Sequence, residues 1–538
     1  MTRRISARAA RGDVAAVVDS SPEAVAGVLE DAAHFPGGHA AGVAFPRSEA
    51  DVASLVRSAR AVLPIGAQSS LTGGATPAGD LVVSTSRMDR VLAVQGARVR
   101  VEPGVALAAL QQALDAHGLY YPPAPTFTGA TIGGTIATNA AGAATFKYGA
   151  TRAWVDALTV VLASGDVLDV TRGEVVAGAD GLFEIEIDGR VVRVPVPTYR
   201  MPEVAKRSAG YHAAPRMDLI DLFVGSEGTL GIVTEATLKV VQRAASQCLA
   251  FVPLSSEQAA LAVTGALRDA VRAAWRGAPS RSPEGFDVPG IEYIDARSLA
   301  LIPDRPLARA GVSRGAAGSV ALFVHLELPP ELDAAQAFEQ IASFDESPAT
   351  PLGRFCGLLA RHGALDSTEI ALPGDIRRAA AFNELREAVP TAVNELIGQA
   401  RRSIDPIVEK VAGDMIVPFE RMREFLQAAR GAFERRGLDL AIWGHMSDGN
   451  LHPNLVPHAS GDVAAAKDAL LELGREVVTL GGCPLAEHGV GRSAVKQALL
   501  RQLYGEAGIE EMRAVKRALD PEWKLAPGVV FTKSQTSG

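Results

Sequence analysis

The stretch YPPAPTFTGATIGGTIATNAAG, residues 121–142, decides the fold. It consists mostly of small residues and has few large apolar side chains, whereas the chain as a whole is rich in apolar residues. Two more glycine-rich stretches lie before and after it, PIGAQSSLTGGATP (64–77) and LFVGSEGTLGIVTEA (222–236). Small residues let backbone N–H groups approach an anion closely, and consecutive N–H groups form an anion-binding nest. The first two stretches do not fit G-x-G-x-x-G or G-x-x-x-x-G-K-[ST], so a Rossmann or P-loop assignment is not supported. Ordinary glycine turns are the alternative.

The composition predicts large cores, since 48% of the 538 residues are hydrophobic and 21% are charged. The formal net charge is 53 − 61 = −8, which argues against a protein that coats nucleic acid or binds an anionic membrane electrostatically. Cys248, Cys356 and Cys483 form no Cys-x-x-Cys pair, so a disulfide framework, an iron–sulfur cluster and a cysteine-ligated zinc site are disfavoured. Neither a secretion signal nor a membrane span is evident, and we expect a soluble, cytoplasmic protein.

Local patterns predict a mixture of helices and strands. Residues 1–40 favour a helical lead-in, and the next segment favours a strand followed by a helix capped near Ser48. Asp188-Gly189 predicts a two-residue hairpin turn between strands at 183–187 and 190–194. A change of character after Val240 indicates a second, α+β domain, with amphipathic helices at 257–272, 377–389 and 419–435 and a strand at 320–326.

A pair of histidines lies in WGHMSDGNLHPN (443–454). Asp448-Gly449 is a preferred two-residue turn, and this turn would place His445 directly opposite His452 across a hairpin. Two opposed imidazoles can bind one metal ion, and Asn454 would lie on the same face of the hairpin. The alternative is that both histidines are half-buried hairpin residues without a metal.

A carboxylate and a third histidine stand together in AEHGVG (486–491), as Glu487 and His488. Two neutral imidazoles and one carboxylate leave open positions on a divalent ion, which suits a catalytic site better than a structural one. The two motifs together are therefore candidates for a metal site.

As a set and in this order, the motifs resemble the FAD-linked enzymes of the vanillyl-alcohol oxidase (PCMH-type FAD-binding) superfamily, in particular its D-lactate and D-2-hydroxyglutarate dehydrogenase branch. The resemblance implies an α+β fold, with a PCMH-type two-subdomain FAD-binding domain and an inserted α+β, ferredoxin-like substrate cap. The expected boundaries are 1–40 for the lead-in, 41–243 for the FAD domain, 244–484 for the cap, and 485–538 for a segment that returns to the FAD domain.

The resemblance also implies which residues contact FAD. They are Ile65, Gly66, Ala67, Gln68, Ser69, Ser70, Pro125, Thr126, Gly129, Ala130, Thr131, Gly133, Gly134, Thr138, Asn139, Gly142, Gly149, Glu227, Gly231 and Ile232. Some relatives tether FAD to a histidine in the first loop, but this chain has Gln68 and no histidine there. Non-covalent FAD is therefore expected.

The second half of the chain is implied to supply the reacting groups. By resemblance, His445, His452 and Glu487 ligate a divalent metal (Zn or Mn), His488 is the base, and Arg386, Asn454 and Lys410 contact the substrate. A solvated helix arginine is the alternative for Arg386. Pro390 and Ala412 stand where enzymes of the hydroxyglutarate type carry Thr and Lys, which puts a five-carbon diacid in doubt.

These features predict an FAD-dependent, metal-assisted dehydrogenase that oxidises a D-2-hydroxy acid, D-lactate-like or D-2-hydroxyglutarate-like, to the 2-oxo acid by hydride transfer to flavin. The electron acceptor, whether a quinone, a cytochrome or an electron-transfer flavoprotein, is left open, and a homodimer is one option. The alternatives are an oxygen-using oxidase on the same fold, a metal-dependent hydrolase without flavin, and a flavin-binding subunit of a larger complex.

Overall fold

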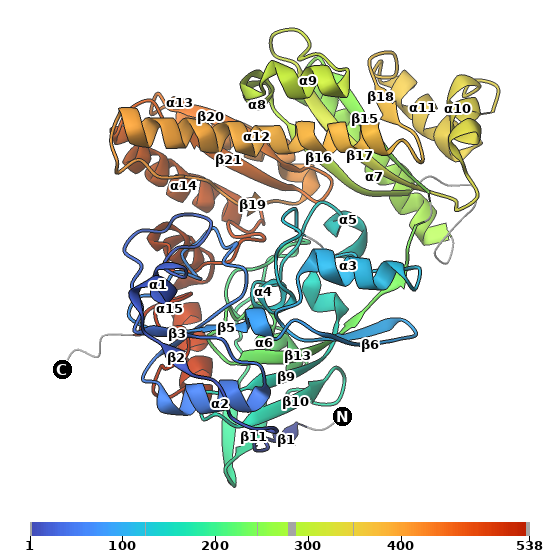
Figure 1. Cartoon of the computed structure of the whole chain (residues 1–538). Helices are drawn as coiled ribbons and strands as arrows, with labels where there is room; N and C mark the ends of the chain where they lie inside the picture. The colour runs from blue at the N-terminus through green and yellow to red at the C-terminus, as the bar shows by residue number, and fades with distance from the viewer. Residues whose placement is uncertain (1–2, 124, 245, 278–286, 348, 534–538) are drawn as a thin grey trace. The chain divides into compact units, whose positions relative to one another are not determined.

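The computed structural model describes residues 3–123, 125–244, 246–277, 287–347 and 349–533. Backbone contacts divide the chain into two compact units (Figure 1). Unit 1 comprises Met1–Gly142, Gly149–Arg243 and Cys483–Gly538, and unit 2 comprises Ala143–Tyr148 and Ala244–Gly482. Unit 1 is thus assembled from three separate segments of the chain.

The elements of unit 1 are short strands and helices, followed by a long C-terminal helical segment that is kinked at Gly505. In chain order they are β1 (Arg4–Ser6), β2 (Val18–Asp19), α1 (Pro22–Ala26), β3 (Gly42–Ala44), α2 (Glu49–Ser58), β4 (Val62–Ile65), β5 (Leu81–Ser84), η1 (Thr85–Arg87), β6 (Val91–Gln95), β7 (Arg98–Val101), α3 (Leu107–Asp115), β8 (Leu119–Tyr120), α4 (Ile132–Ala137), η2 (Thr151–Trp154), β9 (Val155–Val161), β10 (Val167–Thr171), β11 (Leu182–Ile187), β12 (Arg190–Pro195), α6 (Ile220–Phe223), β13 (Ile232–Lys239), β14 (Val241–Gln242) and α15 (Ala494–Leu519).

Two sheets form the centre of unit 1. A four-stranded sheet has the order β2-β3-β5-β4, with β3, β5 and β4 parallel, and a five-stranded antiparallel sheet has the order β10-β9-β13-β7-β6. Ser48 caps α2 by accepting a hydrogen bond from the Asp51 amide, as predicted. Along β13 every second residue is buried, so one face of the strand packs inward.

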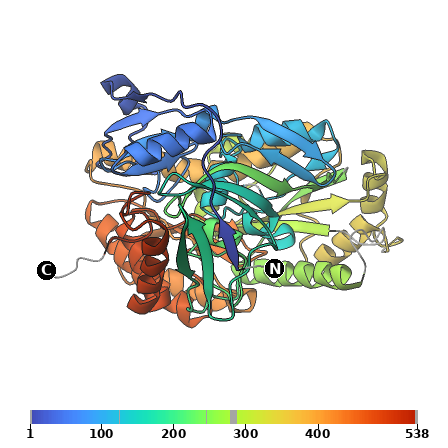
Figure 2. The same cartoon turned by 90° about the horizontal axis from the view of Figure 1, so that it is seen from below.

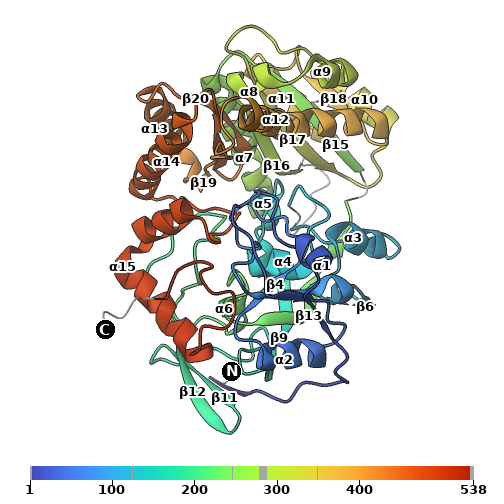
Figure 3. The same cartoon turned by 60° about the vertical axis from the view of Figure 1, so that its left-hand side comes forward.

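A hairpin and the last helix complete unit 1. β11 and β12 pair around Asp188 and Gly189, which both have positive φ, so the predicted turn is confirmed. α15 contacts β12, and Figures 2 and 3 show the helix beside this hairpin. The C-terminal segment therefore belongs structurally with strands that precede it by about 300 residues.

The helical lead-in expected for residues 1–40 is wrong. β1 pairs in parallel with β11, β2 pairs with β3, and among the described residues of this range only α1 is an α-helix. α1 has no buried residue. An Ala-rich segment without an apolar stripe gains little by forming a helix, whereas pairing at a sheet edge satisfies its backbone groups.

Unit 2 is built on one antiparallel sheet with the strand order β18-β15-β17-β16-β20-β21-β19. Its elements are α5 (Thr145–Tyr148), β15 (Ser246–Leu254), α7 (Glu257–Gly277), β16 (Asp287–Ile294), α8 (Ala296–Leu301), α9 (Asp304–Ala310), β17 (Val320–Leu328), α10 (Ala334–Ala342), α11 (Pro351–Arg361), β18 (Glu369–Ala371), α12 (Ile376–Ser403), β19 (Met415–Ile416), η3 (Phe419–Arg421), α13 (Met422–Glu434), β20 (Asp439–His445), β21 (Asn450–Val456) and α14 (Gly461–Thr479).

The long helix α12 packs with α8 and α9 over this sheet, and Figure 1 shows it running across the strands. Phe382 and Leu385 of α12 share a buried cluster with Phe251 and Phe323 of the sheet. The helix was expected to end near Val389 but continues through Pro390 to Ser403. Residues on both sides of the proline are buried, so packing outweighs a hydrogen-bond loss that costs about 3 kcal/mol. No described helix of either unit is long and apolar enough to cross a membrane.

Candidate active site

The histidine motif forms the β20–β21 hairpin of unit 2, but in a different register from the one expected. His445 pairs with Asn450 and His452 pairs with Trp443, so His445 and His452 are not directly opposite each other. The connection contains four residues, 446–449, instead of the two-residue turn Asp448-Gly449. The predicted register is therefore wrong by two residues.

The wider loop has a physical cause in the neighbouring strand and helix. Ser447 is fully buried, and its backbone N–H and its hydroxyl bond the backbone of Ile291 in β16, at 3.2 and 3.0 Å. Arg268 of α7 donates to the Ser447 carbonyl, and the Asp448 carboxylate accepts the Asn450 amide at 3.2 Å. Bonds from β16 and α7 thus satisfy the backbone polar groups of the larger loop. A sequence rule for isolated hairpins does not take such bonds into account.

The two imidazoles nevertheless come together on one face of the hairpin. Residues 450 and 452 share a face, and His445 opposes Asn450, so His445 and His452 are diagonal neighbours. Their ring centroids are 5.7 Å apart at right angles, and both residues are buried. The Asn454 side chain follows on the same face of β21, and its Oδ1 is buried without a hydrogen-bond partner among the described residues.

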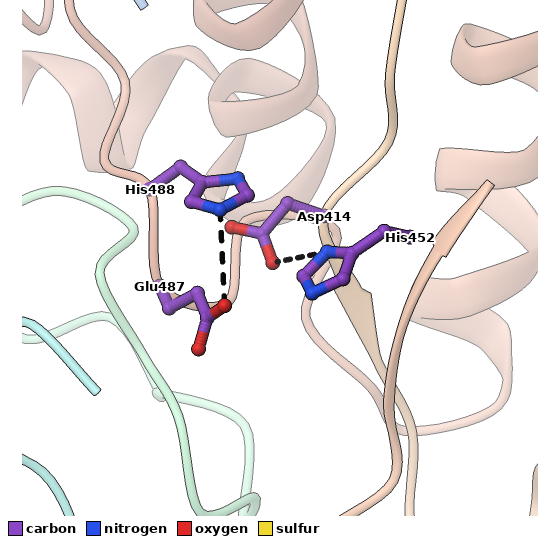
Figure 4. Close-up of side chains that lie close together, drawn as sticks. All are labelled: Asp414, His452, Glu487 and His488. Carbon is purple, nitrogen blue, oxygen red and sulfur yellow. Dashed lines mark ion pairs between the residues drawn. The ribbon is translucent and has the colours of Figure 1, made fainter. Parts of the chain in front are cut away.

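A buried carboxylate lies next to this pair, and the sequence reasoning did not assign it to the site. Asp414 Oδ1 lies 3.6 Å from His452 Nδ1 (Figure 4). It also accepts a hydrogen bond from the side-chain Nδ2 of Asn450 at 3.1 Å. A carboxylate commonly orients a metal-bound histidine through its second ring nitrogen. The sequence gives little indication of this role, because Asp414 lies outside the histidine motifs. It reaches them because the two-residue strand β19, which directly follows it, pairs with β21.

Arg386 projects from α12 to the same sheet. Its Nη1 donates to Glu292 Oε1 at 3.0 Å, and its Nη2 donates to Glu387 at 2.7 Å. Glu292 lies on β16 directly opposite His445. Burial alone would raise the pKa of Glu292, but Arg386 and a bond from His325 hold that pKa well below its usual range. Arg386 is thus a half-buried, paired side chain and not a solvated helix arginine.

Lys410, the third expected substrate contact, lies half-buried in the loop between α12 and β19. Ala412, two residues later, bridges to Asn454. The loop that carries Lys410 therefore reaches the β21 edge of the same hairpin.

Glu487 and His488 lie in the third segment of unit 1. The Glu487 carboxylate is 2.8 Å from Lys206 Nζ, and Lys206 is fully buried. His488 Nε2 lies 3.7 Å from the other oxygen, Glu487 Oε1 (Figure 4). Lys206 is a second residue that the sequence reasoning did not single out, and it supplies the positive charge that a buried carboxylate needs.

The expected FAD contacts all fall in unit 1, in three loops and the ends of the elements beside them. The first loop follows β4, and at Gly66 a Cβ atom would lie 2.1 Å from Thr131 Oγ1, at the start of α4. Only glycine allows this approach. Thr131 Oγ1 is itself buried, with no hydrogen-bond partner among the described residues, so it is a polar group that a ligand would satisfy.

The third glycine-rich stretch closes onto α4. The backbone amides of Gly225 and Glu227 donate to the carbonyls of Ile136 and Ala137, at 2.9 and 2.8 Å. Gln68, Asn139 and Glu227, one from each stretch, are non-glycine residues with positive φ. Such strained residues collect at functional sites. The Gln68 side chain donates to Val28 and Ala75 carbonyls, so it stabilises its own loop.

The remaining expected FAD contacts are placed by the same elements. Ile65 ends β4, with 67–70 in the loop after it; Pro125, Thr126, Gly129 and Ala130 precede α4; Gly133 and Gly134 lie in α4; Thr138, Gly142 and Gly149 follow it; and Gly231 and Ile232 lead into β13.

Comparisons with known proteins agree with this arrangement. Residues 40–171 match a model of the FAD binding domain, and residues 257–530, about half of the chain, match the C-terminal domain of FAD-linked oxidases. The chain belongs to the FAD-linked oxidase family. The glycine-rich stretches 64–77 and 121–142 thus lie in the part that matches an FAD-binding domain, and the chain is an FAD-dependent oxidoreductase by family.

Several relatives cover most of this FAD-linked oxidase. Glycolate oxidase subunit GlcD of Bacillus subtilis is 28% identical over 480 residues, 88% of this chain and 84% of the relative. A D-lactate dehydrogenase of Archaeoglobus fulgidus is 28% identical over 473 residues, covering 87% and 85%. A D-2-hydroxyglutarate dehydrogenase of Xanthomonas citri is 28% identical over 504 residues, covering 91% and 89%.

A solved structure of alkyldihydroxyacetonephosphate synthase has a similar fold. Its TM-score is 0.62 at 15% sequence identity, covering 95% of this chain and 82% of the other. At this identity the likeness concerns the fold alone. It confirms, with the family match, the predicted α+β fold with a PCMH-type FAD-binding domain.

Proposed function

We propose that this member of the FAD-linked oxidase family is a metal-assisted dehydrogenase of small D-2-hydroxy acids. The observation that carries the proposal is the buried pair His445 and His452, on one face of the hairpin with Asn454 and with the Asp414 carboxylate beside His452. Relatives named for D-lactate and D-2-hydroxyglutarate support the substrate class. The cytoplasmic location, the homodimer and the identity of the electron acceptor stay predictions.

The side chains fit both groups that the reaction needs. Imidazole and carboxylate donors suit a divalent ion such as Zn or Mn, and His445 and His452 would hold it with Glu487, the ligand set expected from the sequence. A metal ion there would act as a Lewis acid that lowers the pKa of the substrate hydroxyl. Thr131 Oγ1 and the close approach at Gly66 fit a ligand held by the backbone of the FAD loops.

The residues of this chain would then bind the substrate and accept its hydroxyl proton. FAD, when bound, supplies the acceptor for the hydride that leaves the α-carbon. His488 would accept the hydroxyl proton at Nε2, and the neighbouring Glu487 carboxylate would stabilise the imidazolium. Arg386 would hold the substrate carboxylate, sharing its guanidinium with Glu292 and Glu387. Asn454 Oδ1 would accept a hydrogen bond from the substrate.

The experiment that tests this proposal is anaerobic bleaching of the FAD-loaded protein by D- and L-lactate, D- and L-2-hydroxyglutarate and glycolate. We expect the D-acids to bleach the flavin, and we expect chelation to slow bleaching until Mn or Zn is restored. His452→Ala should abolish the metal response. His458→Ala is the matched control, because His458 is exposed and its ring nitrogen Nε2 bonds the Asp439 carboxylate.

Bleaching by none of these acids in a fully FAD-loaded protein would contradict the substrate class. Unchanged bleaching in protein shown to be metal-free would contradict the role of the metal. Admission of air to the reduced protein separates the alternatives, because rapid reoxidation with release of peroxide would identify an oxidase.

A further inference from the structure

We propose that Glu227 is a positioning residue that fixes the backbone of residues 487–491, the segment that carries the expected base His488. Its two carboxylate oxygens accept hydrogen bonds from consecutive backbone amides, Val490 to Oε1 and Gly491 to Oε2, each at 2.8 Å. The catalytic consequence rests on the function proposed above, whereas the positioning itself does not.

The segment after His488 is held by acceptors from three earlier parts of unit 1. The Gly489 amide donates to Ser208 Oγ at 3.1 Å. The amides of Arg492 and Ser493 donate to the Thr72 carbonyl at 3.0 and 3.1 Å. Of these three acceptor residues, Glu227 alone is ionisable, and the bonds to its ionised form are charge-assisted, about twice as strong as neutral ones. Glu227 therefore dominates the anchoring of this backbone.

Glu227 is itself fixed on the cofactor side. Its backbone has a positive φ of 51°, and its amide donates to the Ala137 carbonyl at the end of α4. At Gly489, which also has positive φ, a Cβ atom would lie 3.0 Å from Glu227 Cδ, so the carboxyl group packs directly against the backbone of the segment. One residue thus connects an FAD loop to the base segment.

This placement gives the side chain of Glu227 a role besides the expected contact with FAD. Both carboxylate oxygens bond the backbone of residues 490 and 491. Burial raises the pKa of Glu227 to about 7, although the two amides and Lys496 lower it. The ionised carboxylate offers two acceptor oxygens, and each of them takes one of the two adjacent N–H donors.

The test is Glu227→Gln, which keeps the shape but replaces one acceptor oxygen with an N–H₂ donor that faces a backbone donor. We expect the limiting rate of anaerobic flavin reduction to fall about tenfold or more, because a small misplacement of a base is costly. Substrate Kd and FAD content should change little. Glu235→Gln is the matched control, since Glu235 lies on β13 of the same unit and is partly exposed beside Arg100.

A double-mutant cycle separates positioning from general loss of structure. In a His488→Gln background, Glu227→Gln should have almost no further effect on flavin reduction, because the positioned group is already missing. Additive losses would overturn the proposal, as would a rate for Glu227→Gln within about twofold of the unchanged protein.

Hydrogen exchange tests the positioning without any substrate. The amides of residues 489–493 should exchange faster in Glu227→Gln than in Glu235→Gln, and unchanged protection would overturn the proposal. If no 2-hydroxy acid reduces the flavin, the proposed function fails while this measurement still decides the role of Glu227. If Glu227→Gln does not retain FAD, Glu227→Asp, which is too short to reach both amides, replaces it with the same expected results.

Discussion

At the residue scale, Glu227 gives a pH dependence with a definite sign. Its pKa is raised by burial from 4.5 to about 7. Because the folded-state pKa lies above the unfolded value, the folded protein binds the extra proton, and its stability falls as pH rises from about 4.5 to about 7. Glu227→Gln should flatten this part of a stability-versus-pH curve measured by urea unfolding. An equally steep curve would contradict the assignment.

Lys206 supports a second prediction at this scale, with effects of opposite sign on stability and metal binding. Lys206→Met would leave Glu487, which is 9% exposed, without its cation, and breaking such a pair costs about 3–5 kcal/mol. The same change removes a positive charge beside an expected metal ligand. The metal-free variant should therefore melt earlier and gain more from added Mn or Zn. Lys467→Met, at a half-exposed pair with Glu409, is the control.

Residue types at the site could be predicted from the sequence, but their partners could not. A histidine pair separated by a glycine-containing turn can be recognised within a segment of twelve residues, 443–454. By contrast, Asp414, Lys206 and Glu292 reach their partners through contacts between distant segments. Nothing in the local sequence around Glu227 indicates that its carboxylate bonds residues 490 and 491.

At the element scale, α15 depends on one buried lysine. Lys516 Nζ donates to the carbonyls of Thr229 and Leu525 and pairs with Asp520 at 2.6 Å. Lys516→Met would leave the buried Asp520 carboxylate without its counter-charge, although two backbone amides still donate to it, and would remove the donor to two carbonyls. We therefore expect a loss of about 3–5 kcal/mol in unfolding free energy. Arg517→Met, the next residue in an exposed pair with Glu510, should change stability by less than about 0.5 kcal/mol. Similar losses for the two variants, measured by urea unfolding, would contradict this reading.

Elements with a strong local signal were predicted well, and those set by tertiary contacts were not. The cap of α2 and the β11–β12 turn depend on neighbouring residues and are confirmed. The register of β20–β21 depends on bonds from Ile291 and Arg268, and the length of α12 depends on packing beyond Pro390. Both therefore differ from the expectation.

At the scale of the whole molecule, the chain order hides how unit 1 is assembled. Residues 143–148 belong with unit 2, although they interrupt the sequence of unit 1. Their α5 contacts β16, and Lys147 pairs with Asp287 at 2.6 Å and with Glu327. No composition change marks this short excursion, so contacts alone reveal it.

The three-segment construction of unit 1 leads to a prediction about truncation. The amide of Val62 in β4 donates to the Lys524 carbonyl at 2.8 Å, and the Ala526 amide returns a bond to Val62 at 2.7 Å. Leu525 is fully buried in the core of the four-stranded sheet. A chain ending at residue 482 would lose these contacts and the bonds to Glu227. Since the seven-stranded sheet of unit 2 lies entirely before that point, we expect unit 2 to stay folded while unit 1 unfolds.

The truncated chain should therefore keep cooperative unfolding and helical circular dichroism from unit 2, yet show no visible flavin absorbance after incubation with FAD. Adding residues 483–538 as a separate chain should restore FAD binding, because the missing segment contributes contacts and not a required chain connection. A truncated chain that binds FAD as tightly as the full chain would contradict this account, since it would mean that the loops after β4 and around α4 hold the cofactor without the segment that anchors β4 and Glu227.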